Sequence, residues 1–254
     1  MIVKSILAAL AAGLIAGVIM TAAQRVQVVP LILHAEEFEN AEPAAAAAEH
    51  HSSVVSPMGD IASFFSPVTP AFAHEHEAAA PGAEEEGGIA FGMSRFVATL
   101  LANLVTGAGF GLLLAGASLV IGKPVTLANG ATWGAVGWLA MHLLPAVGLP
   151  PELPGFPAAE LGDRQIWWVA SVVLSAAGLY LLIIRKEALA KVAGILLIVA
   201  PIAWGAPQPA DINSAVPAVL AAEFAVAALA VALLSWIVLG LSLGFLNEKL
   251  AKAA

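Results

Sequence analysis

The sequence contains no cysteine, and charged residues make up only 11% of its 254 residues. Without cysteine the chain forms no disulfide, iron–sulfur cluster or thiolate metal site, so any metal ion must be bound by His, Asp, Glu or Met. A soluble domain carries about 25% charged residues. Here hydrophobic residues reach 60% and the mean hydropathy is +0.92. This composition excludes a soluble globular domain and indicates a membrane protein.

Basic residues are also scarce, with ten Lys and Arg against eighteen Asp and Glu and a net charge of −8. Nucleic-acid-binding proteins neutralise phosphates with a clustered basic face, so we expect no nucleic-acid partner. The sequence also lacks a glycine-rich phosphate loop that ends in lysine, which excludes ATP hydrolysis by this motif. The acidic excess instead favours cations as ligands, and nothing in the sequence predicts an enzyme.

Long apolar runs are the main feature that is present. A membrane-spanning helix needs roughly 20 mostly apolar residues, and the chain offers six such stretches, at 3–23, 96–121, 126–145, 166–184, 191–205 and 218–245. We therefore predict an all-α polytopic membrane protein with about six transmembrane helices, forming one domain over residues 1–254. A cleaved signal peptide is the alternative interpretation of residues 1–23, because Lys4 and the small residues at 21–23 are compatible with one.

The distribution of Lys and Arg predicts the orientation, since cytoplasmic loops are enriched in both. With six spans and a cytoplasmic N-terminus, seven of the ten basic residues fall inside, namely Lys4, Lys123, Arg185, Lys186, Lys191, Lys249 and Lys252. Only Arg25, Arg95 and Arg164 fall outside, where most of the acidic residues also lie. We therefore expect a multi-pass protein of the bacterial inner membrane, embedded in the lipid bilayer, with both termini cytoplasmic.

Several spans carry small residues four positions apart, which lets helices pack closely. The pairs and ridges are Gly13 and Gly17; Gly107, Gly111 and Ala115; Gly130 and Gly134; Gly240 and Gly244. The stretch 107–111 superficially resembles a nucleotide-binding glycine loop. It lies within an apolar span and has no preceding strand, so we predict helix packing there.

The only long polar segment, residues 36–94, separates the first two spans. Its composition is rich in Ala, Glu, Pro and Ser and cannot bury enough apolar surface to fold alone, so we predict a mostly disordered extracytoplasmic loop. Five of the six histidines fall in or beside it, namely His34, His50, His51, His74 and His76. Imidazole and carboxylate groups suit divalent transition metals. The alternative is an acidic, solvated loop whose histidines are incidental.

Two ionisable residues lie within predicted spans, where such groups are expensive and often functional. His142 stands three residues before Pro145, and Glu223 stands six residues after Pro217. At 1.5 Å per residue both are expected at similar depth in the outer leaflet. The alternatives are a hydrogen bond between the two side chains or an interaction of each with the lipid headgroups.

Three stretches, 29–39, 101–107 and 141–155, resemble the CbtA family of predicted cobalt transporter subunits, and residues 164–168 and 216–218 agree with it. The resemblance implies a multi-span protein that moves cobalt for cobalamin synthesis, often beside a small His-bearing single-span subunit, CbtB. By position the family pattern marks Glu36, Glu39, His142, Glu152, Arg164, Gln165, Trp167 and Trp168. The chain departs from the family at Val219, where an acidic residue is common, and offers Glu223 one turn later. Its segment 44–88 is longer than usual.

The predicted function is therefore that of a membrane component of a divalent-metal transporter, with Co²⁺ as cargo and no prosthetic group. Hydrated cations would concentrate at the acidic outer face. The predicted metal ligands are His34, Glu36, Glu39, His74, His76, His142 and Glu223. The alternative is a non-transporting membrane scaffold that delivers metal ions to a separate permease. A haem-containing oxidoreductase is disfavoured, because only one span contains a histidine.

Overall fold

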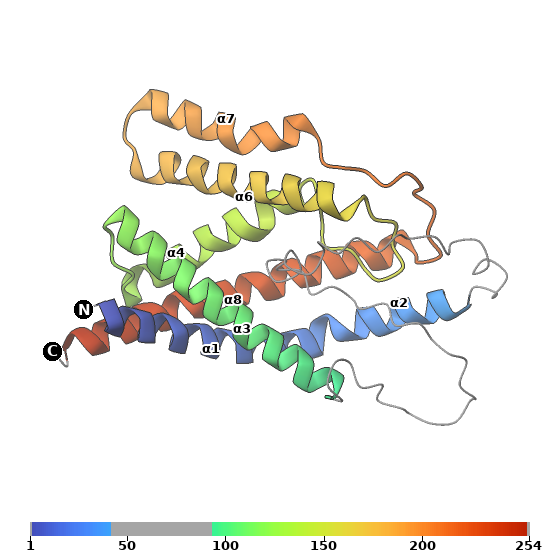
Figure 1. Ribbon diagram of the computed structural model, residues 1–254, viewed down its shortest axis with the longest axis horizontal. Coiled ribbons are helices and arrows are strands. Elements are labelled where there is room, and N and C mark those ends of the chain that lie inside the picture. The colour runs from blue at the N-terminus through green and yellow to red at the C-terminus, as the bar shows by residue number, and fades with distance from the viewer. Residues whose placement is uncertain (1, 42–92, 253–254) are drawn as a thin grey trace.

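A computed structural model describes residues 2–41 and 93–252, which are almost entirely helical (Figure 1). The helices in chain order are α1 (Ile2–Gln27), α2 (Val29–Ala41), α3 (Arg95–Ile121), α4 (Leu127–Trp138), the π-helical turn η2 (Leu139–Leu143), α5 (Leu144–Ala146), α6 (Leu161–Ile184), α7 (Ala188–Trp204) and α8 (Ala218–Lys252). The predicted outer loop falls mainly at 42–92, outside the described residues. The loop was predicted to begin at residue 36, but residues 36–41 form the end of α2.

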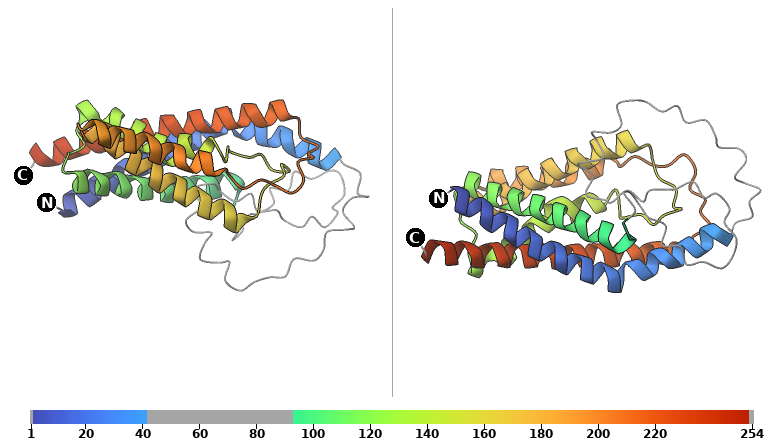
Figure 2. Two further views of the ribbon diagram at one scale, coloured as in Figure 1. Left: turned by 90° about the horizontal axis from the view of Figure 1, so that it is seen from above. Right: turned by 60° about the horizontal axis from the view of Figure 1, so that its bottom comes forward.

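The helices form an elongated bundle in which all the long helices run close to the long axis (Figures 1 and 2). The first turn of α1 and the last turn of α8 lie at the same end, together with the α3–α4 and α6–α7 connections. The opposite end carries α2 and the starts of α3, α6 and α8. This arrangement matches an even number of crossings.

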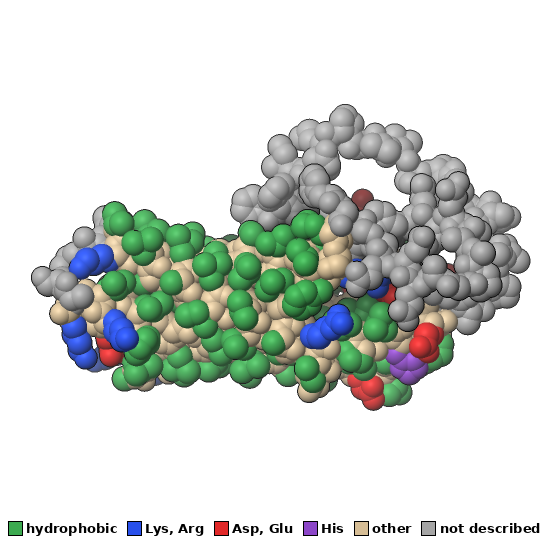
Figure 3. All heavy atoms as spheres, turned by 90° about the horizontal axis from the view of Figure 1, so that it is seen from below, with side chains coloured by type: hydrophobic (Ala, Val, Ile, Leu, Met, Phe, Trp, Pro, Cys, Tyr) green, Lys and Arg blue, Asp and Glu red, His purple; other side chains and the backbone are tan. Residues whose placement is uncertain are grey.

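Helices α1, α3, α6 and α8 are each long and apolar enough to cross a membrane. The 17-residue apolar helix α7 and the continuous stretch α4–η2–α5 run beside them. The all-helical, multi-pass fold class is thereby confirmed, and six spans are compatible with it. In Figure 3, hydrophobic side chains cover the flank, Lys and Arg side chains gather at one end beside an acidic one, and further acidic, basic and histidine side chains lie toward the other end.

Helices α1 and α2 form a single rod with a break at Val28. Pro30 has no N–H, so the helix loses one i→i−4 hydrogen bond at this point. Backbone bonds continue on both sides, from Val28 N–H to the Gln24 carbonyl (2.9 Å) and from Ile32 N–H to the Val28 carbonyl (3.2 Å). Beyond the break, Ala35 and neighbouring apolar residues pack against the first turns of α8, so the rod extends the bundle at its acidic end.

Two helix pairs pack through glycine, as the spacing of small residues predicts. On α1 and α3, Gly13 lies against the Gly107 backbone, and a Cβ at Gly17 would be 2.5 Å from the Asn103 carbonyl oxygen. On α4 and α8, Gly130 and Gly240 lie against each other in the same way. The prediction of helix packing is therefore confirmed, including at the glycine-rich stretch 107–111.

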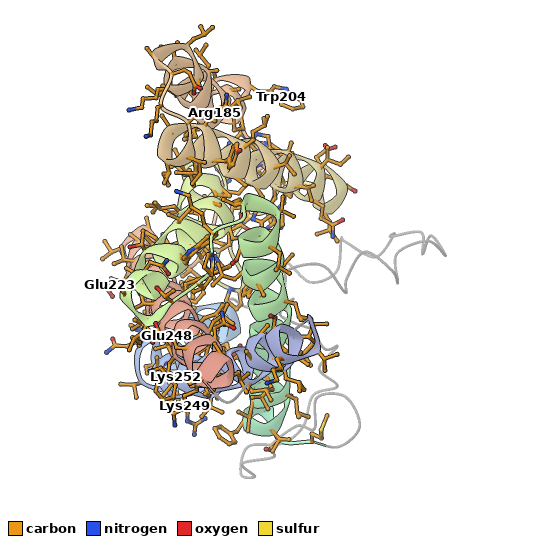
Figure 4. All side chains as sticks on the ribbon, turned by 90° about the vertical axis from the view of Figure 1, so that its left-hand side faces the viewer. Arg185, Trp204, Glu223, Glu248, Lys249 and Lys252 are labelled. Carbon is orange, nitrogen blue, oxygen red and sulfur yellow. The ribbon has the colours of Figure 1, made fainter. Side chains whose placement is uncertain are left out.

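Helices α6 and α7 form a hairpin that touches the rest of the described bundle mainly through η2 and α5. Within the hairpin, a Cβ at Gly178 would be 2.6 Å from the Gly194 carbonyl oxygen. The tight turn between the helices is held by an exposed ion pair, with 3.2 Å between Arg185 Nε and Glu187 Oε2. Figure 4 shows Arg185 far from Lys249 and Lys252 of α8. The hairpin is thus a peripheral unit.

Candidate functional site

His142 lies in η2, a single wide turn that Pro145 creates. The Leu144 N–H donates to the Leu139 carbonyl, five residues back, whereas Pro145 has no N–H to donate. The Leu144 N–H thus bonds to Leu139 instead of Ala140, its usual α-helical acceptor. Isolated π-helical turns are frequent at functional sites. The local sequence thus gives His142 an irregular backbone inside the bundle.

Aromatic side chains from two other helices enclose the His142 ring. The indole Nε1–H of Trp236 on α8 donates to His142 Nδ1 at 3.2 Å. Phe110 on α3 meets the imidazole edge-on, with 5.8 Å between ring centroids, and lies 4.8 Å from the Trp236 ring. The imidazole is therefore held between α3 and α8 rather than facing lipid.

A small cavity of about 10 Å³ opens beside this aromatic group, which is roughly the space that one water molecule needs. Its lining comes from α1, α3, η2 and α8, and its side chains with a heteroatom are Met20, His142, Ser235 and Trp236. The Met20 thioether and the Ser235 hydroxyl were not predicted as site residues. Only their position on helix faces that turn inward distinguishes them from other residues of the same type.

The hydrogen bond to Trp236 determines how His142 can act. An indole N–H only donates, so the Nδ1 lone pair is occupied and the neutral ring carries its proton on Nε2. A metal ion could bind Nδ1 only by displacing the Trp236 N–H. It could bind Nε2 only if the proton moved to Nδ1, which also breaks that bond. Trp236 and a metal ion therefore compete for His142.

A polar cluster lies one helical turn from the cavity, toward the end of the bundle that carries α2. Asn103 Nδ2 donates to Thr21 Oγ1 at 3.0 Å and to Gln24 Oε1 at 2.6 Å. The Thr21 hydroxyl itself donates to the Gly17 carbonyl at 2.9 Å. The sequence analysis did not predict this cluster of buried side-chain amides and hydroxyls between α1 and α3. The sequence does contain a signal for it, because Asn103 is a polar residue in the middle of an apolar run. Such residues often hydrogen-bond between membrane helices.

The predicted outer ligands do not gather around His142. Glu36 pairs with Arg95, with 3.3 Å between Oε1 and Nη1, and His34 is exposed, with its ring 5.3 Å from that of Phe38. The Glu39 side chain, His74 and His76 lie outside the described part of the chain. Within the described ranges, no group of three or more His, Asp and Glu side chains is close enough to hold a metal ion.

Glu223 does not share the depth of His142. It precedes Trp236, the hydrogen-bond partner of His142, by thirteen residues on α8, which is about 20 Å along a helix. Its side chain is exposed and points away from the bundle (Figure 4). The expected similarity in depth fails because α8 is 35 residues long and its first turns extend beside α2 beyond the main bundle. No hydrogen bond joins the two side chains.

Glu152 and Arg164, two positions of the family pattern, form a partly buried ion pair at the same end, with 2.7 Å between Oε2 and Nη2. Burial raises the pKa of the Glu152 carboxyl, and the positive charge of Arg164 partly opposes this shift. Trp167 is buried one turn further along α6, against Gly148. This pair fixes the loop between α5 and α6 to the start of α6.

Comparison with known families decides the membership of the chain. Residues 2–248 match the family described as "Probable cobalt transporter subunit (CbtA)". The chain belongs to the CbtA family. The match covers nearly the whole sequence, including every described helix that lines the His142 cavity. Neither a curated protein nor a solved structure matches the chain. Membership in CbtA makes it a transporter-type membrane subunit, with cobalt as the ion suggested.

Proposed function

We propose that this CbtA-family chain carries Co²⁺ across the membrane for cobalamin synthesis, and that His142 is the side chain that the ion meets inside the bundle. The observation that carries this proposal is the position of the His142 imidazole beside a cavity at the junction of α1, α3, η2 and α8. The Asn103 cluster lies between this cavity and the acidic end of the molecule. Its amide and hydroxyl oxygens can replace part of the water lost by an entering cation.

Competition between Trp236 and the metal ion suits transport. Before the ion arrives, the Trp236 N–H occupies the Nδ1 lone pair of His142, so the buried imidazole stays satisfied. When the ion leaves, the same hydrogen bond re-forms and offsets part of the lost metal–nitrogen bond. A site of this kind binds weakly and releases readily. Moving a divalent cation down 100 mV yields about 4.6 kcal/mol, which would drive the step.

The outer residues would act before this site. We assign His34, Glu36, Glu39, Glu223, His74 and His76 to capture of the ion at the outer face. These residues lie on α2, at the start of α8 or in the predicted outer loop, so they would attract the cation rather than complete one rigid coordination shell. A small His-bearing single-span subunit of the CbtB type would supply further ligands. Copurification of that subunit with the chain tests this part of the proposal.

For the orientation, we propose a bacterial inner membrane with both termini in the cytoplasm. The two ends of the described chain and the basic α3–α4 and α6–α7 connections share one end of the bundle (Figures 1 and 3), and basic loops stay in the cytoplasm. Reporter domains fused after Arg185 and after Lys252 should both be cytoplasmic. An external reporter at Lys252 alone would contradict this orientation.

Uptake of radiolabelled Co²⁺ by cells tests the role of His142. We expect His142→Ala and His142→Gln to abolish saturable uptake, since Gln keeps the size and hydrogen bonding of the residue but is a poorer ligand for the ion. The matched control is Trp236→Phe, which keeps an aromatic ring and removes the competing N–H together with part of the indole volume. This variant should retain uptake, with a lower KM. Normal saturable uptake by well-expressed His142→Gln protein would refute the site.

A non-transporting scaffold that delivers ions to a separate permease is the second candidate. The observation in its favour is the small size of the cavity, about 10 Å³, closed by the stacked Phe110 and Trp236 rings. Purified chain in sealed liposomes distinguishes the two functions. A transporter moves Co²⁺ to the interior of these vesicles, whereas a scaffold binds the ion without moving it.

A further inference from the structure

One face of α6 carries buried polar side chains without partners. Trp167, Ser171 and Ser175 are 4%, 1% and 0% exposed, and their spacing of four residues places them on the same side of the helix. Within the described residues, the Trp167 Nε1 and the two serine Oγ atoms make no hydrogen bond, and neither does the Arg164 Nε one turn earlier. Such groups are costly within a membrane.

Hydroxyls elsewhere in the bundle behave differently. The Thr21 and Thr99 side chains both donate to the carbonyl four residues earlier, each at 2.9 Å, which is the usual way for a hydroxyl in a membrane helix to be satisfied. Ser171 and Ser175 make no such bond. Their hydroxyls therefore remain available to a partner outside their own helix.

Among the described helices, α6 packs mainly against α7 and to a lesser extent against η2 and α5. The close contact between Gly178 and Gly194 fixes how the antiparallel helices align. Counting back along α6 and forward along α7, Ser175 is level with Leu197, and Ser171 is level with Pro201. Because Pro201 has no N–H, the carbonyl of Leu197 lacks its usual helical donor. The interface thus brings unsatisfied donors of α6 to the depth of a freed acceptor of α7.

The chemistry of this polar face selects water rather than a metal ion. Trp167 and Arg164 offer only donors and so supply no ligand for a metal ion, and the charge of the guanidinium is balanced by Glu152. Successive side chains four residues apart are separated by about 6 Å along the helix, and one water molecule making two hydrogen bonds of about 2.8 Å spans nearly the same length. One water molecule per turn would therefore satisfy every group in the row.

We propose that a single file of water molecules enters between α6 and α7 from the outer end and extends to Ser175. It begins at the Glu152–Arg164 pair and ends where Gly178 and Gly194 bring the two backbones together. The outer halves of the helices part to admit it, since the polar atoms are covered in the packed hairpin. From residue 164 to 175 the file is about 16 Å long, or half of a hydrocarbon core of about 30 Å. This water route is separate from the His142 cavity and does not depend on the transported metal.

The absence of cysteine from the chain permits a direct test with the full-length protein in cells. Ser171→Cys and Ser175→Cys are nearly isosteric changes, and the control is Val173→Cys, at intermediate depth on the exposed side of the same helix. External Ag⁺, which is similar in size to water, is applied first, and the remaining thiols are labelled with fluorescent maleimide after denaturation. We expect Ag⁺ to block labelling at 171 and 175 and to leave Val173→Cys labelled. Free labelling at both serine positions, or protection only by Ag⁺ supplied to inverted vesicles, would overturn the proposal.

Stability provides a second measurement that does not rely on a thiol. If the hydroxyls are hydrated, Ser171→Ala and Ser175→Ala remove hydrogen bonds and lower the Tm of the purified protein. If the interface is permanently dry, the same changes remove unsatisfied polar groups and raise the Tm. A raised Tm for both variants would overturn the water file, and neither test measures Co²⁺ uptake, so the proposed function stands or falls separately.

Discussion

Close glycine contacts hold the α1–α3 and α4–α8 pairs as well as the α6–α7 hairpin, but the buried polar groups beside these contacts differ. In both regions two glycines bring backbones together, at Gly130 with Gly240 and at Gly178 with Gly194. Between α1 and α3, however, the buried amide of Asn103 is hydrogen-bonded, whereas the polar groups buried on α6 are not. A satisfied, tightly packed contact has nothing to gain from opening. The hairpin gains hydrogen bonds when it opens, so we assign it the mobile role.

The largest expected effect comes from adding one methyl group to the glycine-packed pairs. At Gly130 a Cβ would be 2.8 Å from the Gly240 carbonyl carbon, and backbone atoms of two long helices cannot move aside. We expect Gly130→Ala to destabilise the protein by about 3 kcal/mol and to reduce the folded fraction after extraction in detergent.

The same substitution at two other glycines tests the comparison. A Cβ at Gly116 would meet nothing within 4 Å, so Gly116→Ala should be neutral or slightly stabilising through helix propensity, by up to about 1 kcal/mol. Gly178→Ala should cost less than Gly130→Ala, because part of the clash is with the flexible Ile198 side chain and the hairpin can shift. An equal loss of Tm at positions 130 and 178 would show that the hairpin is as rigid as the core.

The sequence predicted the packing of the small residues but not their partners. Spacing alone shows that Gly13 and Gly107 lie on closely packing faces, yet which helices meet depends on the three-dimensional arrangement. The sequence also placed the end of the first span too early, since α1 runs to Gln27 and α2 follows at once. Polar residues at 36–41 suggested a loop, whereas burial of Ala35 against α8 extends the helix through this segment.

For the candidate site, the sequence identified His142 but not its surroundings. A histidine near a proline in an apolar span was sufficient to single it out, and Pro145 proves to be the cause of the wide turn that holds it. Phe110 and Trp236, which contact it, and Met20, which lines the same cavity, come from three other helices and leave no pattern in the sequence. The expected depth of Glu223 failed because hydropathy cannot show how far a 35-residue helix extends past the membrane.

An intermediate loss of stability is expected when the hydrogen bonds of Asn103 between α3 and α1 are removed. Asn103→Leu removes the donor for both Thr21 and Gln24, and should lower stability by on the order of 1 kcal/mol, the scale of hydrogen bonds between membrane helices. The control is Thr99→Val, a half-buried residue whose hydroxyl bonds within its own helix, with little change expected. Thermal unfolding of the two purified variants measures the difference. If Asn103→Leu proves as stable as the control, the hydrogen bonds of this region do not distinguish it from the hairpin.

The smallest effect concerns pH at the outer end of the hairpin, where Glu152 and Arg164 fasten α6 to the preceding loop. Burial raises the pKa of Glu152 above its ordinary value of 4.5, and Arg164 only partly opposes this. The folded state therefore holds the proton more tightly than the unfolded state. The resulting stability is fully present below pH 4.5 and is lost as the pH rises through the raised pKa. Glu152→Gln has no ionisable group at this position and should lack that decline.

A second carboxylate, Glu187, serves as a control because its contribution to stability changes with pH in the opposite direction. The pKa of the exposed Glu187 is lowered, first by a hydrogen bond from its own backbone and then by Arg185, so its contribution is present above its ordinary pKa and is lost as the pH falls. Relative to wild type, Glu152→Gln should therefore gain in Tm as the pH rises from 4.5 toward neutral. Glu187→Gln should instead lose Tm relative to wild type as the pH rises toward 4.5 from below, with a constant difference above pH 4.5. Both differences should be small, because the first group is paired with a cation and the second is solvated. Parallel pH profiles for wild type and Glu152→Gln would mean that the outer end of the hairpin is already open to water in the folded protein, so that the Glu152–Arg164 pair does not close it.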